Sequence, residues 1–311
     1  MNYSNLGLNT EQPLVSAIVP VFNDRDRLKM CLQSLTQQTY PSEKLEIIVV
    51  DNGSEEDIKS LVEGFNGVTY CYEGEPGSYA ARNKAISVAK GEIFAFTDAD
   101  CLPANQWVEA GVRQFLQTPN CGLAAGNIEL FFKNCDRPTA VEVYESIEMG
   151  FDQDELIAEQ QYGLTANLFT SRQIIAKVGC FDPNLKSGGD REWGQRVFAA
   201  GYELIFVPNA LVKHPTRHSF WQLYKRITRI NGGNFDVSKI HVSFQQKLKS
   251  IGKDLFLAFT PPFRSIFRLW SEEKLPTNTR RIQFVSVMLF VRYVSAWERI
   301  RLKLGGASRR W

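Results

Sequence analysis

Short apolar segments alternate with helical patterns over the first hundred residues, and this alternation limits the possible folds more than any other feature of the sequence. Apolar runs of this length, separated by helices, are typical of parallel strands whose two faces are both covered. The sequence therefore predicts an α/β fold with a doubly wound, mostly parallel central sheet between layers of helices. The predicted strands are Val15–Phe22, Leu45–Val50, Val68–Tyr72 and Ile93–Thr97.

Three of these strands are followed directly by a polar side chain, namely Asn23, Asp51 and Asp98. In doubly wound sheets, ligands bind beyond the carboxyl ends of the strands. The first strand is not followed by the G-x-G-x-x-G of dinucleotide-binding proteins, and the sequence contains no P-loop motif. The edge of the predicted sheet is therefore expected to bind a ligand by other means.

Asp98 and Asp100 are separated by one residue at the end of the fourth strand. Side chains two apart on a strand point the same way, so these carboxylates repel each other unless a cation lies beside them. Oxygen ligands favour Mg²⁺ or Mn²⁺, which usually bring phosphate oxygens with them. The alternative is an ordinary strand end. The spacing is too short for the two carboxylates of a retaining glycosidase, which lie about 5 Å apart.

The charge of the chain is unevenly distributed. Residues 1–212 contain 16 Lys and Arg against 29 Asp and Glu, a net charge of −13, whereas residues 213–311 contain 20 against 5, a net charge of +15. A basic C-terminal region indicates an anionic partner such as phospholipid headgroups, a phosphorylated substrate or nucleic acid. Because no known nucleic-acid-binding module is present, no nucleic-acid partner is expected.

The C-terminal region, residues 221–311, is predicted to be helical, amphipathic and basic. One helix begins near Trp221 and is expected to break at Asn231–Gly233, and another spans Arg281–Leu304. Between them, the segment from Lys247 to Trp270 interleaves aromatic residues with Lys and Arg. Such helices, without a spanning segment of about 20 apolar residues, are typical of surface-lying membrane anchors. The alternative is that they pack on the rest of the protein.

The cysteines and the N-terminal residues indicate in which cellular compartment the protein is found. Six cysteines are scattered without a C-x-x-C pair, which suits a reducing compartment. Residues 1–12 lack the basic and apolar regions of a signal peptide. We therefore expect a cytoplasmic protein, either free or peripheral on the cytoplasmic face of the membrane.

Five motifs occur in the order and spacing found in family 2 inverting glycosyltransferases, which the chain thus resembles over about residues 14–220. The resemblance implies a GT-A fold in residues 1–220, with a nucleotide-sugar half at about 14–101 and an acceptor half at about 102–220. It also implies sugar transfer from a nucleotide-diphosphate donor, with a UDP-sugar favoured, to a glycan or lipid-linked acceptor in polysaccharide or glycolipid assembly. The motifs are Pro20–Asn23, Val49–Ser54, Gly77–Asn83, Thr97–Asp100 and Gly189–Trp193.

The resemblance implies a role for each matched residue. Asp100 and His214 would hold a divalent metal, Mn²⁺ or Mg²⁺, and Asp190 would be the general base that removes the proton of the acceptor hydroxyl. His218 is a rival to His214. The nucleotide-sugar-binding residues would be Pro20, Asn23, Asp51, Arg82, Asn83 and Asp98.

The sequence departs from the family pattern at two positions. Asn52 stands where many relatives have a second aspartate, so the resemblance leaves open whether a second carboxylate contacts the nucleobase. Gly189 stands where many have a glutamate before the catalytic aspartate, so Glu192 is a rival to Asp190 as the base. Trp193 is expected either to stack on an acceptor sugar or to belong to the core.

Two other functions compete with glycosyl transfer. A nucleotidyltransferase also pairs a nucleotide site with metal-binding carboxylates, but usually has a Gly-rich basic loop after the first strand, which Val21–Asp24 does not resemble. A non-catalytic nucleotide-sugar-binding module would bind the donor without turnover, and only the departure at Gly189 favours it.

Overall fold

The computed structural model describes residues 12–237, 251–256, 260, 275 and 277–309, and the chain divides into two compact units. Unit 1 comprises Met1–Glu129, Phe151–Asn184 and Gly189–His214, and unit 2 comprises Leu130–Gly150, Leu185–Gly188 and Pro215–Trp311. Most of the predicted aromatic and basic segment between Lys247 and Trp270 lies outside the described residues.

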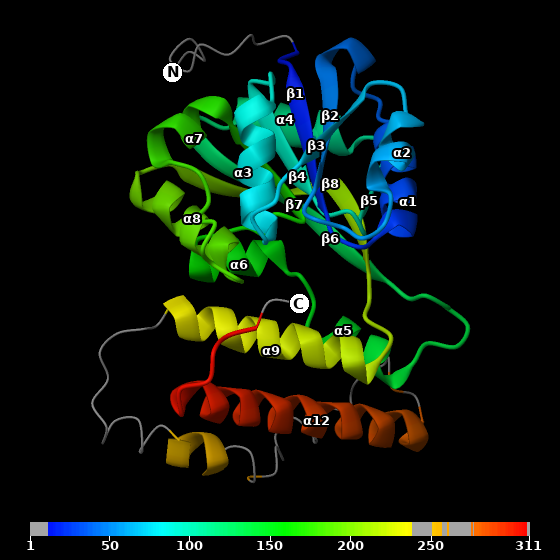
Figure 1. Cartoon of the computed structure of the whole chain (residues 1–311), viewed down its shortest axis with the longest axis vertical. Coiled ribbons are helices and arrows are strands. Elements are labelled where there is room, and N and C mark those ends of the chain that lie inside the picture. The colour runs from blue at the N-terminus through cyan, green and yellow to red at the C-terminus, as the bar shows by residue number, and fades with distance from the viewer. Residues whose placement is uncertain (1–11, 238–250, 257–259, 261–274, 276, 310–311) are drawn as a thin grey trace. The chain divides into compact units, whose positions relative to one another are not determined.

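The sheet of unit 1 has eight strands in the order β3-β2-β1-β4-β7-β6-β8-β5 (Figure 1). β1 is parallel to β2 and β4, and β2 is parallel to β3, whereas β7 is antiparallel to β4 and β6 and β5 is antiparallel to β8. The predicted α/β fold is thus confirmed. The strands are β1 Val15–Val21, β2 Leu45–Asp51, β3 Val68–Tyr72, β4 Ile93–Thr97, β5 Leu102–Pro103, β6 Cys121–Phe131, β7 Asn167–Ser171 and β8 Glu203–Pro215.

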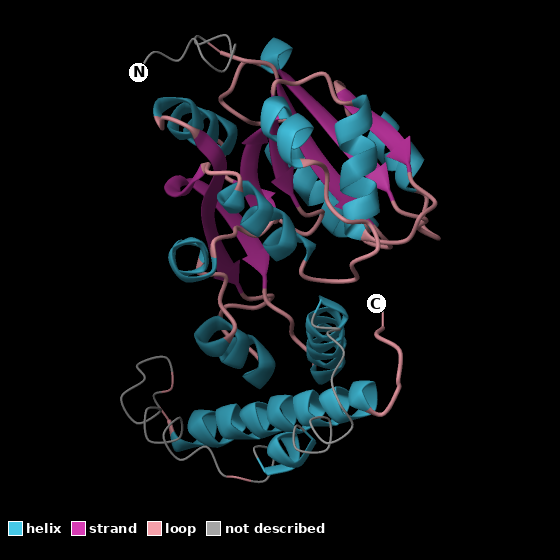
Figure 2. Ribbon diagram, turned by 90° about the vertical axis from the view of Figure 1, so that its left-hand side faces the viewer, coloured by secondary structure: helices cyan, strands magenta, loops and turns pink. Residues whose placement is uncertain are grey.

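Helices cover both faces of this sheet (Figure 2). Alternate strand residues such as Val15, Ala17 and Val19 pack with apolar residues of α1, α2 and α4 in one buried cluster. On the other face, α3 contacts β1 and β2, and Phe96 packs edge-on against Phe181. The helices of unit 1 are α1 Arg25–Leu35, α2 Ile58–Glu63, α3 Ser78–Val88, α4 Trp107–Gln117, α6 Gln153–Gln160, α7 Arg172–Val178 and α8 Gly189–Ala199, with a 3₁₀ turn η2 at Ser42–Lys44.

The helix that follows β2 begins only after a loop at residues 52–57. α2 starts at Ile58, and the side chain of Asp57 caps it by accepting a hydrogen bond from the Ser60 N–H at 3.0 Å. Ser54 is engaged elsewhere, because its Oγ accepts a hydrogen bond from the Asn23 N–H at 2.9 Å. The loops after β1 and β2 are therefore tied together at the carboxyl edge of the sheet.

Unit 2 is helical, with α5 (Ala140–Glu148), α9 (Phe220–Val237) and α12 (Asn278–Lys303), and residues 251–256 are also helical. Its core joins side chains of all three long helices, including Tyr144, Leu223 and Phe284. None of the helices in the described ranges is long and apolar enough to cross a membrane.

The helix break expected at Asn231–Gly233 is wrong, because α9 continues to Val237. Close packing explains the glycines there. A Cβ atom on Gly233 would lie 2.5 Å from the Cβ of Ser187, and one on Gly232 would lie 3.0 Å from the Cβ of Ser308. The glycines therefore permit two chain segments of unit 2 to approach the helix, and the packing offsets their low helix propensity.

Candidate functional site

The ends of β1 and β2 place Asn23 and Asp51 at one edge of the sheet, since Val21 is paired with Asp51. Asn23 adopts a left-handed backbone conformation (φ 49°), and its Oδ1 accepts a hydrogen bond from the Glu55 N–H at 2.8 Å. Asp51 is buried, and its carboxylate accepts hydrogen bonds from the Ser54 N–H at 2.9 Å and the Tyr70 hydroxyl at 3.1 Å. Asp51 is thus a fixed hydrogen-bond acceptor at this edge.

Two exposed aromatic side chains lie at the same edge of the sheet as Asp51. Phe22 at the end of β1 is 55% exposed, and Tyr72, the register partner of Asp51 on β3, is 57% exposed. Flat apolar rings exposed beside a hydrogen-bond acceptor suit the recognition of an aromatic ligand. Sequence reasoning assigned neither ring a role, although their positions at strand ends were a usable signal. Pro20 is buried within β1.

Asn52 supports the loop that leads into α3. Its Nδ2 donates hydrogen bonds to the carbonyls of Glu73 (3.0 Å) and Glu75 (2.7 Å), while its Oδ1 accepts one from the Gly77 N–H at 2.6 Å. An aspartate could not donate the first two bonds. The departure from the family pattern at this position therefore has a structural explanation.

Arg82 on α3 is buried and paired with Asp98, with 2.5 Å between its Nη2 and the Oδ1 of Asp98. Its Nε is also buried and has no hydrogen-bond partner among the described residues. A buried N–H without an acceptor is costly, and an oxygen of a ligand or water would satisfy it. Burial raises the pKa of Asp98; Arg82 acts against this rise, and Asp100 adds to it.

Asn83, the next residue on α3, is engaged with the backbone of Phe181. Its Nδ2 donates a hydrogen bond to the Phe181 carbonyl at 2.8 Å, and its Oδ1 accepts one from the Phe181 N–H at 3.1 Å. The amide is thus used to hold the segment that precedes α8.

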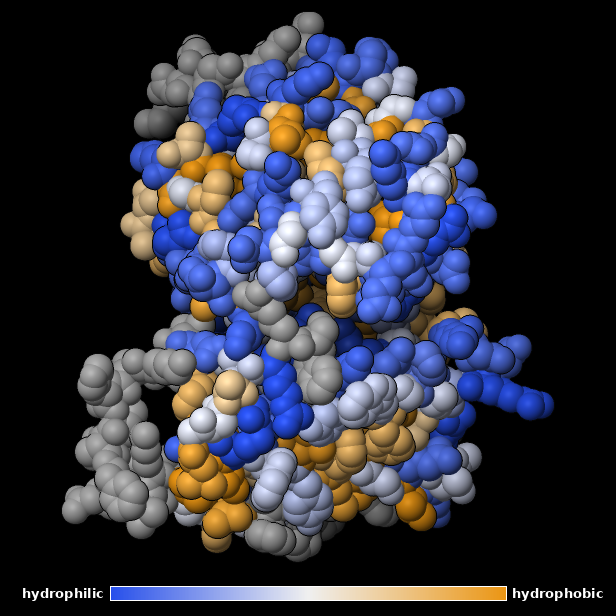
Figure 3. All heavy atoms as spheres, in the orientation of Figure 1, coloured by the Kyte–Doolittle hydropathy of each residue, from blue (hydrophilic) through white to orange (hydrophobic). Residues whose placement is uncertain are grey.

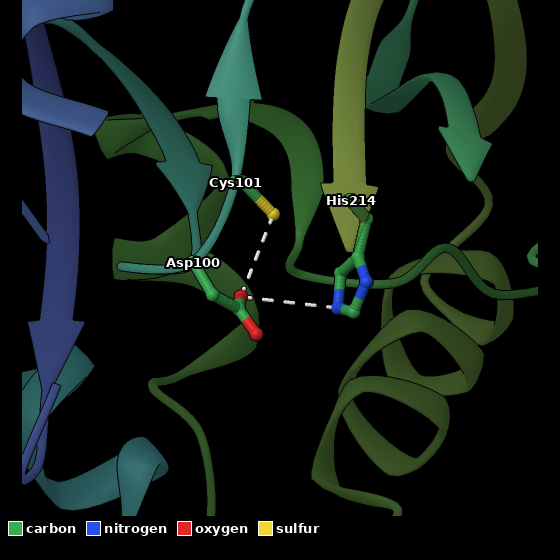
Figure 4. A group of neighbouring side chains, drawn as sticks. All are labelled: Asp100, Cys101 and His214. Atoms are coloured by element: carbon green, nitrogen blue, oxygen red, sulfur yellow. Dashed lines mark hydrogen bonds and ion pairs between the residues drawn. The ribbon is translucent and has the colours of Figure 1, made fainter. Parts of the chain in front are cut away.

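Asp100, Cys101 and His214 form a group of metal-ligating side chains at the ends of β4 and β8, in which the ligand atoms lie within 4.8 Å of one another (Figure 4). The Nε2 of His214 is 3.8 Å from the Oδ1 of Asp100. On the other side of this carboxylate, the Nη1 of Arg27 is 3.6 Å from its Oδ2, and Arg27 also pairs with Asp24 at 2.7 Å. Sequence reasoning found Asp100 and His214 but missed Arg27.

The side chains in this group fit a hard or borderline divalent ion. A carboxylate oxygen suits Mg²⁺ and Mn²⁺, and an imidazole nitrogen is acceptable to the more versatile transition metals. Burial raises the pKa of the Cys101 thiol well above its usual value, with Asp100 and Asp98 adding to the effect. A thiol suits softer ions than Mg²⁺ and Mn²⁺, so for these two ions the usable donors here are Asp100 and His214.

Asp190 lies at the start of α8, and three hydrogen bonds hold its half-buried carboxylate. The hydroxyl of Tyr79 donates to its Oδ1, while the N–H and the hydroxyl of Thr165 donate to its Oδ2, each at 3.3 Å. Tyr79 and Arg82 are both on α3, so one helix contacts Asp190 and Asp98.

The rival acid Glu192 is paired differently. Both of its oxygens accept hydrogen bonds from Arg196, at 2.6 and 3.0 Å, in an (i, i+4) ion pair on α8. Trp193 is fully buried, and its Nε1 donates a hydrogen bond to the Gly179 carbonyl at 2.9 Å. Of the two expectations for Trp193, the structure supports the core residue. His218, the rival to His214, belongs to unit 2.

Comparisons with known proteins show which sequences and folds this chain is similar to. The family model "Glycosyl transferase family 2" matches residues 16–177. Glycosyltransferase AglE of *Haloferax volcanii* is 34% identical over 92% of each chain. A dolichyl N-acetyl-α-D-glucosaminyl phosphate 3-β-D-2,3-diacetamido-2,3-dideoxy-β-D-glucuronosyltransferase of *Methanococcus voltae* is 21% identical over 68% of this chain and 70% of its own. Among solved structures, the mannosyltransferase PcManGT of *Pyrobaculum calidifontis*, in complex with GDP-Man and Mn²⁺, is similar in fold, with a TM-score of 0.62 at 18% identity over 96% of this chain and 93% of its own.

Proposed function

The chain belongs to glycosyltransferase family 2, and we propose that it transfers a sugar from a UDP-sugar to an acceptor hydroxyl, with inversion at the anomeric carbon. The observation that carries this proposal is that α3 contacts both of the carboxylates the reaction needs on its two sides. Arg82 pairs with Asp98 on the donor side, and Tyr79 binds Asp190 on the acceptor side. PcManGT, which is similar in fold, holds GDP-Man and Mn²⁺ in its structure, and this supports a nucleotide-sugar donor and a divalent ion but not the choice of UDP over GDP.

Asp51 and its neighbours would bind the nucleoside. The fixed carboxylate of Asp51 accepts a hydrogen bond from an imide N–H, which uracil presents, and Phe22 or Tyr72 offers a ring for stacking. Guanine also presents N–H groups, and a GDP-sugar is therefore the second candidate. Asn23 and the buried Pro20 shape this edge of the sheet, while Asn83 holds the neighbouring segment in place.

Asp100 and His214 would hold the divalent ion, and Asp98, which pairs with Arg82, would bind the ribose or a water molecule. The mixed oxygen and nitrogen donors favour Mn²⁺ over Mg²⁺, which prefers oxygen ligands alone. When bound, such an ion stabilises the negative charge that develops on the departing diphosphate. Arg82 adds a fixed positive charge beside Asp98, and its unpaired Nε is available to an oxygen of the donor.

Asp190 would act as the general base. In an inverting displacement, the acceptor hydroxyl attacks from the face opposite the leaving diphosphate and loses its proton to a carboxylate. Glu192 is a weaker candidate, because Arg196 occupies both of its oxygens.

The test is a donor panel. With Mn²⁺, we expect nucleoside diphosphate release from one UDP-sugar to exceed that from GDP-, CDP- and ADP-sugars, and NMR of the product to show an inverted anomeric configuration. Asp51→Asn should raise the KM for the donor by roughly 10- to 100-fold with little change in kcat, since it weakens a charged hydrogen bond that binds the base. Asp136→Asn, an exposed residue of unit 2, is the control.

Other results would redirect the assignment. A preference for a GDP-sugar would overturn the assignment of uracil as the nucleobase, but the protein would still be a glycosyltransferase. Saturable UDP binding without release from any donor would favour the non-catalytic binding module instead.

We also propose that unit 2 binds an anionic membrane surface, where a lipid-linked acceptor would be found; the *Methanococcus voltae* relative, by its name, acts on a dolichyl-linked substrate. Unit 2 contains 22 Lys and Arg against 9 Asp and Glu. Exposed apolar side chains occur on α12 at Ile282 (67% exposed) and Trp297 (67%), and directly after it at Leu304 (74%). Apolar and charged patches alternate over unit 2 in Figure 3. Such a surface suits headgroups and the acyl boundary together.

Flotation with vesicles tests the membrane proposal. At low salt we expect binding to vesicles that contain an anionic phospholipid, weaker binding to neutral vesicles, and a loss of binding as salt is raised. Trp297→Glu should reduce binding several-fold, whereas Phe198→Glu, at an exposed aromatic residue of unit 1, should not. Absence of binding to anionic vesicles at low salt would contradict the proposal.

A further inference from the structure

We propose that Tyr79 is a positioning residue for the base Asp190, and that position 189 is glycine because the ring of Tyr79 fills the space that a side chain there would need. This inference rests on the proposed function, because it assigns Asp190 the role of base. It also explains why position 189 departs from the family pattern. The alternative function, a non-catalytic binding module, would attribute Gly189 to a loss of catalytic activity.

The hydroxyl of Tyr79 lies between the backbone and the carboxylate at the start of α8. It accepts a hydrogen bond from the Gly189 N–H at 2.9 Å and donates one to the Oδ1 of Asp190. Burial raises the pKa of Tyr79, with Asp190 adding to the effect, so the hydroxyl keeps its proton and remains a donor at neutral pH. One side chain thus fixes both the first turn of α8 and the orientation of the carboxylate.

The ring of Tyr79 is held in place by other aromatic side chains. It stacks on Phe181 with 5.8 Å between ring centroids and an interplanar angle of 25°. Phe181 in turn packs against Phe96 at 5.5 Å and Trp193 at 5.2 Å. Since these three rings are buried, the tyrosine ring cannot move aside without disturbing the core.

The ring of Tyr79 leaves no room for a side chain at position 189. A Cβ atom on Gly189 would lie 2.7 Å from the Cε2 and Cζ atoms of Tyr79, a distance that real Cβ contacts do not reach. A residue larger than glycine at position 189 therefore requires a smaller residue at position 79. The tyrosine ring fills the space into which a side chain at 189 would project.

The hydrogen bonds to Asp190 leave room for a substrate. A carboxylate has about four lone-pair directions. Tyr79 uses one on Oδ1, and Thr165 uses two on Oδ2 through its N–H and hydroxyl. Among the described residues no other donor contacts this carboxylate, so about one direction remains for the proton of an acceptor hydroxyl. Tyr79 thereby helps to determine which lone pair of Asp190 accepts the proton of the acceptor hydroxyl.

A double-mutant cycle with Asp190 tests the inference. We expect Tyr79→Phe to lower kcat roughly 10- to 100-fold, the usual value of one charge-assisted hydrogen bond, while the donor KM and the Kd for UDP stay unchanged. In the Asp190→Asn background, Tyr79→Phe should lower kcat less than about twofold, because the group through which it acts is gone. Radiolabelled donor gives the sensitivity that the slow variants need.

Tyr40→Phe is the matched control. Tyr40 is also buried in unit 1, and its hydroxyl donates a hydrogen bond to the Pro13 carbonyl at 2.6 Å. Its loss should leave kcat within about twofold of wild type, since it removes a comparable bond away from Asp190. Gly189→Ala should lower Tm in the wild-type background. In the Tyr79→Ala background, the same Gly189→Ala substitution should lower Tm less, because the ring that meets the new methyl group is absent.

Each outcome is decisive. An equal fall in kcat from Tyr79→Phe with and without Asp190, or no fall at all in an active enzyme, would overturn the positioning role and leave the proposed function intact. A wild-type chain that neither transfers nor hydrolyses any donor would overturn the proposed function and, with it, the role of Tyr79. Additive Tm changes at positions 79 and 189 would overturn the steric pairing.

Discussion

Asp190→Asn is expected to lower kcat by about 10²- to 10⁴-fold, the usual contribution of a general base. Asparagine keeps the shape of the side chain, and its Oδ1 can still accept the hydrogen bonds from Tyr79 or Thr165. It cannot accept a proton from the acceptor hydroxyl. The fall should therefore appear in kcat, measured as product formation at saturating donor and acceptor, with little change in the donor KM or in Tm.

Glu192→Gln is the control for the choice of base. Because Glu192 already forms two hydrogen bonds with Arg196 within α8, its replacement should change kcat less than about tenfold and act mainly on stability, by about 0.3–0.5 kcal/mol for a partly exposed (i, i+4) pair. A loss of activity in Glu192→Gln with activity retained in Asp190→Asn would reverse the assignment.

The sheet edge could be predicted from the sequence because the signals there are local. Buried parallel strands appear as continuous apolar runs, and the predicted strand ends at Val50 and Thr97 agree to within one residue with the ends of β2 at Asp51 and of β4 at Thr97. Since the carboxyl ends of neighbouring parallel strands lie at one edge, the grouping of Asn23, Asp51 and Asp98 followed from strand order alone. No contact had to be known in advance.

The rest of the site depends on contacts between segments far apart in the chain, which local patterns do not contain. Tyr79 and Asp190 are 111 residues apart, and no local pattern connects them. The Nη1 of Arg27 on α1 lies 3.6 Å from the Oδ2 of Asp100, an approach that the local sequence around neither residue indicates. The glycines of α9 predict a helix break when only the local sequence is considered, because their packing partners, Ser187 and Ser308, lie far away in sequence.

The antiparallel part of the sheet was also beyond local patterns. β7 pairs with β4 and β6 in antiparallel orientation, yet its apolar sequence does not reveal its direction. The consequence for the site is large. β8, which carries His214, reaches the end of β4 through this half of the sheet, and so the contact between His214 and Asp100 depends on a topology that the sequence did not predict.

Asp100→Ala is expected to abolish both activity and binding of Mn²⁺. Of the two usable ligands, Asp100 carries the negative charge that a hard cation needs. Since the loss of a residue that only supports a ligand already costs about 10- to 100-fold in metal affinity, loss of the ligand itself should cost more than about 100-fold. Binding of Mn²⁺ to the protein with and without UDP, followed by electron paramagnetic resonance, measures this independently of turnover.

Two further variants separate the ion from the surrounding charges. Cys101→Ser removes the thiol but neither of the two donors, and it should leave the affinity for Mn²⁺ within about threefold, whereas His214→Asn should weaken it by at least about tenfold. Arg27→Met should strengthen Mn²⁺ binding, because it removes a cation 3.6 Å from the same carboxylate. If Asp100→Ala binds Mn²⁺ as tightly as the wild type while Cys101→Ser does not, the metal is held by a different set of ligands, and the assignment of Asp100 and His214 is wrong.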